Sequence, residues 1–265
     1  MTPTALPPPL RLLPGLLLPG LLLLGLLLLG LLLLLQAAGG HGTKDEGAEE
    51  PPRLPAPGTF NAHVLAVLAT YATDGAHGYH WPRRGAWLGF TRTLRYDGRV
   101  LGEGDPQGRC HCSGLTFEVF FRAWERWCRS VGRPFRIADL DFEGVRRLQQ
   151  QWFGTSGDRA TLATALVGNG LGVRIERRED ARPGDFVQLW RHSGSGHSCV
   201  FLGWVREGAR VVGLRYWSTQ SSTNGIGARE ERFGASGSTV KEDEFYVVRV
   251  GSPPSDVGAP PADDD

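Results

Sequence analysis

The chain has 265 residues, 41% of them hydrophobic, four cysteines and a formal net charge of +1. This length is sufficient for one sizeable folded domain with its own core. The balanced charge argues against nucleic acid as the main partner, because such proteins carry a strong basic excess.

Residues 1–38 are typical of a targeting segment. Positions 10–35 are almost entirely leucine, Arg11 supplies a positive charge at the start of the run, and small residues follow it. The run is longer than the about 7–15 residues of most signal peptides and approaches the roughly 20 that span a bilayer. We expect either a cleaved signal peptide or a membrane anchor through residues 10–35. Either one places the folded part outside the cytoplasm, in the periplasm, cell envelope or extracellular space.

The first half of the remaining chain is predicted to be helical. Residues 39–58 are rich in Gly, Glu and Pro, which indicates a flexible linker. Apolar spacing predicts a helix over 60–73, whereas the glycine-rich stretch 74–109 predicts turns with short strands around 86–96. A stripe of large apolar residues then predicts a helix that begins at Cys112.

That helix is expected to end near Gly132-Arg133-Pro134. Two shorter helices are predicted over 141–152 and 159–167, the second with Asp158 as its N-cap. The pattern then changes to short strands separated by turns. These strands are expected at Phe186–Trp190, Ser198–Val205, Val211–Gln220 and Phe245–Val250.

Helices followed by an antiparallel meander define an α+β fold, in which N-terminal helices pack on a small antiparallel sheet. We assign residues 59–250 to this domain and residues 251–265 to a disordered acidic tail.

Cys112 is the candidate nucleophile. It lies where an irregular segment becomes a helix, and the first N–H groups of a helix stabilise a thiolate and an oxyanion. The small residues Ser113 and Gly114 are expected to let a substrate approach the backbone. An isolated cysteine is usually structural, so the assignment depends on its partners.

His197 is the candidate base, because it opens a predicted strand and a histidine can take the thiol proton. His192 is its rival, five residues earlier. A third polar group should orient the imidazole from the neighbouring strand. Gln220 is the first choice, Ser218 the second and Asn224 the third. Cysteine on a helix start with histidine on a strand is the arrangement of papain-like hydrolases.

These residues carry a resemblance to the NlpC-type cell-wall cysteine peptidases and, more distantly, to the CHAP amidohydrolases. Cys112-Ser113-Gly114-Leu115 is similar to the family's nucleophile motif, and Tyr79-His80-Trp81 to the start of its aromatic motif. Pro183-Gly184-Asp185-Phe186-Val187 and the run from His197 to Gly203 are similar to its strand motifs. The resemblance spans residues 61–225, and the order of its motifs selects His197 over His192.

The chain departs from the family in three places. His111 replaces the usual aspartate before the nucleophile, Pro82 follows Trp81 where the family has glycine, and residues 132–180 contain an insertion. These differences concern substrate preference more than the chemistry.

The resemblance implies a papain-like fold and an exported thiol peptidase or amidase. Cys112, His197 and Gln220 would be catalytic, and Tyr79, Trp81, Ser113 and Gly114 would contact substrate. The implied substrate is an amide bond in peptidoglycan stem peptides, and no cofactor is implied.

Three alternatives stay open. One is an inactive papain-like binding or structural domain of the cell envelope. Another is a thiol hydrolase or acyltransferase that acts on a different amide. The third is a zinc site built from Cys110, His111, Cys112, His197 and Cys199. An exported chain also permits a disulfide, and with Cys112 free at most one can form.

Overall fold

The computed structural model describes residues 54–82, 87–154 and 157–251. The targeting segment, most of the linker and residues 252–265 of the tail lie outside the described residues. Every described residue belongs to one compact unit, Glu50–Asp265. Within the described ranges, no helix is long and apolar enough to cross a membrane.

The described chain has helices first and a large sheet afterwards. The α-helices are α2 (Phe60–Leu68), α3 (Cys112–Ser130), α4 (Phe142–Trp152) and α5 (Thr161–Gly168). A small hairpin, β1 (Leu94–Tyr96) and β2 (Arg99–Gly102), precedes α3. The main strands are β3 (Gly172–Ile175), β4 (Phe186–Arg191), β5 (Gly196–Glu207), β6 (Arg210–Gln220), β7 (Gly225–Arg232) and β8 (Val240–Val250). Two 3-10 turns, η1 (Arg178–Asp180) and η2 (Ser221–Thr223), complete the elements.

The expected first helix is shorter than predicted. Thr59 caps α2 by accepting the Ala62 N–H, but the helix ends at Leu68 rather than at residue 73. The Thr70 and Tyr71 amides bond back only three residues, which tightens the chain into a turn. Tyr71 then donates from its hydroxyl to buried Glu118, so it belongs to the core without being helical.

Helix α3 is the centre of the fold. His111 caps it, with the Nδ1 atom accepting the Gly114 N–H at 3.2 Å. Aromatic side chains on α3 contact α2, α4 and the sheet. The ring pairs are Phe60–Trp124, Phe120–Trp152 and Phe120–Phe186, with centroids 5.3–6.3 Å apart. Burying this apolar area is the main stabilising term that fixes the start of α3 against the sheet.

The two shorter helices occur as expected, but one cap is different. Asp141 caps α4 through the Gly144 N–H. Asp158 is not the N-cap of α5, which begins at Thr161 after Ala160. Its carboxylate accepts from the Ala160 N–H and the Thr164 hydroxyl instead. Asp158 therefore holds the turn before α5 rather than its first residue.

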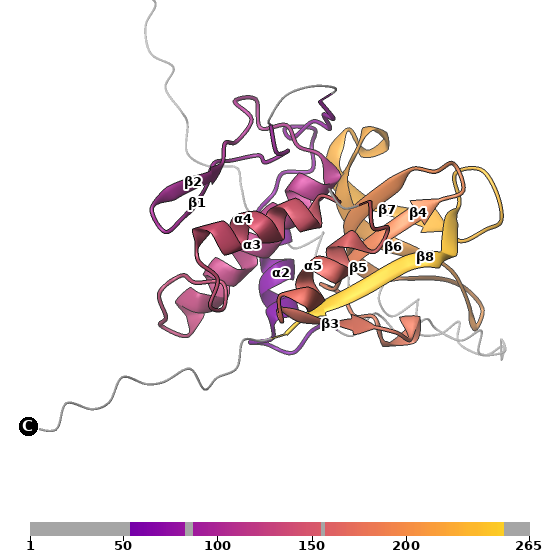
Figure 1. Cartoon of the computed structure of the whole chain (residues 1–265). Coiled ribbons are helices and arrows are strands. Elements are labelled where there is room, and N and C mark those ends of the chain that lie inside the picture. Colours follow the sequence, from indigo (N-terminus) through magenta and orange to yellow (C-terminus); the bar gives the residue numbers. More distant parts are fainter. Residues whose placement is uncertain (1–53, 83–86, 155–156, 252–265) are drawn as a thin grey trace, which may run out of the picture. The chain divides into compact units, whose positions relative to one another are not determined.

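The six main strands form one antiparallel sheet in the order β3-β8-β4-β5-β6-β7 (Figure 1). Strands β3 and β7 are the two edges, and the sequence analysis did not predict either of them. β7 is rich in glycine and charge, and β3 has four residues with no buried side chain, so neither has an apolar pattern. Strand β8 starts at Val240, five residues before the predicted start, through a charged stretch.

The sheet has two covered faces. Val200, Trp217 and Val248 face the helices in the main core. On the other face, Cys199, Phe201, Leu214 and other apolar residues form a second cluster. There Trp204 of β5 contacts Phe245 of β8, although β4 lies between these strands, so the sheet curls over this cluster. Helices and antiparallel strands in these segments confirm the α+β class.

Candidate active site

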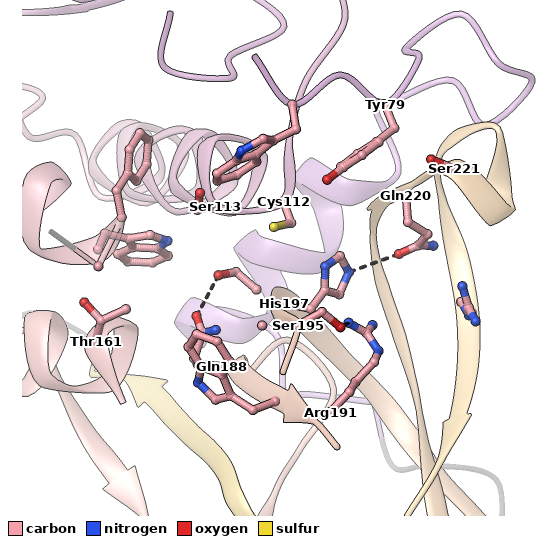
Figure 2. A pocket seen from close by; sticks show the side chains of 18 of the residues that line it. Tyr79, Cys112, Ser113, Thr161, Gln188, Arg191, Ser195, His197, Gln220 and Ser221 are labelled. Atoms are coloured by element: carbon pink, nitrogen blue, oxygen red, sulfur yellow. Dashed lines mark hydrogen bonds between the residues drawn. The ribbon is translucent and has the colours of Figure 1, made fainter. Parts of the chain in front are cut away.

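A pocket of about 740 Å³ opens where α3 starts and where β5 and β6 meet (Figure 2). Cys112, His197 and Gln220 all line it, from α3, β5 and β6 respectively. The strand register brings the last two together, because His197 is the second residue of β5 and Gln220 is the last residue of the antiparallel β6. Three residues separated by up to 108 positions in the chain thus share one cavity.

Cys112 is the first residue of α3, as the sequence predicts. Backbone groups of Ser198 and Ser113 lie close enough to its sulfur to lower the pKa of the thiol, so Cys112 lies beside the residue that follows His197. All four cysteines are free thiols. Of these four, Cys112 alone lines the described pocket, and this distinguishes it from Cys110, Cys128 and Cys199.

Hydrogen bonds around His197 define which of its ring nitrogens can act as a base. Thr223 Oγ donates to the Gly225 carbonyl at 2.6 Å, so it accepts from Gln220 Nε2 at 2.9 Å. This fixes Gln220 Oε1 as the atom that faces His197 Nε2 at 3.0 Å, and Nε2 must be the donor. The neutral ring therefore keeps its lone pair on Nδ1. Figure 2 shows Cys112 and Gln220 on different sides of this ring.

The competing residues have other partners. Ser218 donates to the Ser198 carbonyl. Asn224 has φ of 50° and caps η2 in the left-handed region. His192 Nε2 bonds to the Gly234 carbonyl at 2.8 Å. Among the candidates for the third residue, Gln220 is the one that contacts His197.

The protonation of the site differs from the expected thiolate. Burial raises the pKa of the Cys112 thiol, although the Ser198 and Ser113 backbone and the Arg191 charge oppose this shift. Burial, helped by the same arginine, lowers the pKa of His197 to about 4. At pH 7 the site thus holds a neutral thiol and a neutral imidazole, because desolvation disfavours both charged forms.

The expected substrate-contact residues divide into two groups. Tyr79, Trp81 and Ser113 line the pocket, and Figure 2 shows Tyr79 directed into it from the Cys112 side. Gly114 does not contact the pocket. A Cβ added there would lie 2.2 Å from the Leu88 carbonyl oxygen, so Gly114 allows close packing of the preceding loop on α3. The structure gives Gly114 a packing role, and its contact with substrate stays a prediction.

A buried polar network in the pocket wall was not predicted from the sequence. Arg191 of β4 donates to both oxygens of Glu231 of β7 at 2.7 Å, and Tyr216 donates to the same carboxylate at 2.6 Å. Arg229 approaches it at 3.4 Å. No sequence signal pointed to this network, because β7 itself was not predicted and arginine is abundant throughout the chain.

The described residues do not support the zinc alternative. No group of three His, Cys, Asp or Glu side chains within them converges as metal ligands. Cys110 is fully buried, which raises its pKa to about 12, and His111 uses Nδ1 to cap α3. Both side chains thus have structural positions rather than a shared centre.

Comparisons with known proteins found no relative of this chain, so any proposal about its function must rest on the sequence and the site. No family model matches the chain, and no curated protein or solved structure is significantly similar to it.

Proposed function

We propose that the protein is an exported papain-like cysteine hydrolase that cleaves amide bonds. The observation that carries this proposal is the shared pocket of Cys112, His197 and Gln220, in which Gln220 holds the His197 lone pair on Nδ1. A nucleophile, a base and a residue that orients the base are the three parts that thiol acyl transfer needs.

The neutral pair favours general-base catalysis. His197 Nδ1 takes the Cys112 proton as the sulfur attacks the substrate carbonyl carbon. The same nitrogen then protonates the leaving amine, the C–N bond breaks, and a thioester on Cys112 remains. Water, deprotonated by Nδ1, hydrolyses the thioester and releases the acid. The Cys112 and Ser113 N–H groups at the start of α3 would stabilise the oxyanion.

Peptidoglycan stem peptides are the proposed substrate class. The motifs around Tyr79, Cys112 and His197 support this choice through their resemblance to cell-wall peptidases. The leucine-rich segment at 10–35 supports export to the compartment where that substrate lies.

Digestion of purified cell wall tests this function. The full-length protein should release soluble muropeptides with new amino termini, and Cys112→Ala should release none. Cys128→Ala is the matched control, since Cys128 is buried in the main core away from the pocket lining.

Two other outcomes identify the alternatives. Intact cell wall together with hydrolysis of another amide would replace the substrate class. Binding of cell wall by both the wild type and Cys112→Ala, without cleavage of any amide, would favour the inactive binding domain.

A further inference from the structure

The charges in the pocket wall are not balanced. Two guanidinium groups, Arg191 and Arg229, meet a single carboxylate, Glu231. Asp158 also lines the pocket and carries a negative charge, but it belongs to the turn before α5, where its oxygens accept from the Ala160 N–H and the Thr164 hydroxyl. The wall formed by β4 and β7, taken by itself, therefore carries one surplus positive charge.

The guanidinium group of Arg191 is occupied by its ion pair with Glu231. Its Nε and Nη2 donate to the two oxygens of Glu231, and only 14% of its side chain is exposed. A bidentate pair of this kind is strong and directional. Arg191 therefore mainly neutralises Glu231 and holds it in position.

Arg229 has donors to spare. It uses Nε toward Glu231 and Nη1 toward Ser222, yet its side chain lines the pocket and is 38% exposed. A guanidinium has five N–H donors in a planar fork that matches a carboxylate. The remaining donors of Arg229 are thus available to a ligand in the cavity.

Hydroxyl groups adjoin these arginines. Ser195, Ser221 and Ser222 line the same pocket, and Figure 2 shows Ser195 beside Arg191 and Ser221 next to Gln220. Hydroxyls supply further donors to an anion. The aromatic residues Trp152 and Phe153 also line the cavity, so it offers apolar contacts as well as the cationic wall.

We infer that this pocket selects substrates with a free carboxylate near the scissile amide, and that Arg229 is the specificity-determining residue that binds it. The inference rests on the proposed function and names the substrate class more narrowly. Carboxylate binding at Arg229 would orient the neighbouring carbonyl toward Cys112.

Paired alkylating reagents test the inference without any hydrolysis. Iodoacetate and iodoacetamide differ only in charge, and bromoacetyl-glycine and bromoacetyl-glycinamide place the same difference farther from the reacting carbon. The alkylation rate of Cys112 by each reagent is measured at pH 9 by mass spectrometry on the full-length protein. The same ratio for free cysteine in the same solution is the reference.

In at least one pair, the anionic reagent should be favoured at Cys112 by about tenfold relative to free cysteine, as expected for one charge-assisted contact. Arg229→Gln should abolish this preference. This variant should fold, because Glu231 keeps its bidentate bonds to Arg191. Arg210→Gln is the control. It removes an exposed arginine at the opposite end of β6, about 30 Å from Gln220, and should leave the preference unchanged.

A Cys112 ratio equal to that of free cysteine in both pairs would overturn the inference. So would a preference that Arg229→Gln leaves intact, or a Cys112 that none of the reagents reaches. A charge preference without any amide hydrolysis would support the carboxylate subsite and reject the hydrolase, so the two proposals fail separately.

Discussion

Thr223 acts through Gln220 to determine which ring nitrogen of His197 carries the proton. Its hydroxyl donates to Gly225 and accepts from Gln220, and this directs the Gln220 carbonyl oxygen at the imidazole. An amide that turned around would offer a donor to Nε2 and move the ring proton to Nδ1, where a base needs its lone pair. In the proposed mechanism, Thr223 is therefore a positioning residue.

Thr223→Val should lower kcat roughly tenfold and leave KM nearly unchanged, because the Gln220 amide loses the acceptor that fixes its orientation. Steady-state hydrolysis of the best amide substrate measures both constants. Thr239→Val, a matched change at a half-buried threonine away from the pocket lining, should leave kcat at the wild-type value. An unaltered kcat in Thr223→Val would show that this hydroxyl does not orient the pair.

At the scale of elements, the start of α3 is fixed by tight packing as well as by its cap. The helix begins at Cys112, and Gly114 brings it against the backbone of Leu88 and Gly89. The loop and the helix are therefore held at a separation that no larger side chain allows, and this position sets the depth of Cys112 in the pocket.

Gly114→Ala should destabilise the protein by at least about 2 kcal/mol, because overpacking at a rigid backbone contact cannot relax. Urea unfolding followed by tryptophan fluorescence measures the change. Gly168→Ala at the end of α5 is the control, since a Cβ there meets no atom within 4 Å. It should be neutral or slightly stabilising. Equal stability of Gly114→Ala and the wild type would contradict the packing role.

The sequence predicted the elements that bury regular apolar patterns. Helices α3 and α4 and strand β4 occur within one residue of most of their expected limits, since large apolar residues recur there with the right period. The edge strand β7 was missed because its sequence, GIGAREER, has no alternation. Pairing with β6 determines its conformation, and a pairing between segments is not a local property.

At the scale of the molecule, a buried ion pair joins strands that are not neighbours in the curled sheet. Arg191 of β4 and Glu231 of β7 pair directly although two strands, β5 and β6, separate them in the sheet. Only 5% of the Glu231 side chain is exposed, so this ion pair joins distant strands inside the curl. The candidate site depends on the same link, since Arg191 and His197 line one pocket.

Glu231→Gln should lower the free energy of unfolding by about 3–5 kcal/mol, because it leaves a buried arginine without its charge partner. Chemical denaturation at pH 7 measures the loss. Glu207→Gln removes an exposed partner of Arg210 and Arg232 and should cost less than about 1 kcal/mol. Similar small losses in the two variants would contradict the closing role of Glu231.

The candidate site was predictable only in part, because some of its properties depend on contacts between distant segments of the chain. Cys112 and His197 lie at a helix start and a strand start, which local patterns reveal, and Gln220 ends the neighbouring strand on which an orienting group was expected. The protonation state was not predictable. It depends on how deeply the folded chain buries both groups, and that depth follows from packing between distant segments.

Acyl transfer from p-nitrophenyl acetate measures whether Cys112 attacks a carbonyl carbon with His197 as its base. Incubation of the full-length protein at pH 7 should place one acetyl group on Cys112, detected by peptide mass spectrometry. His197→Ala should slow this step by about 10²-fold or more, as expected for loss of a general base. Acetylation of other residues but not of Cys112, or acetylation of Cys112 at the same rate in His197→Ala, would rule out this pairing of nucleophile and base.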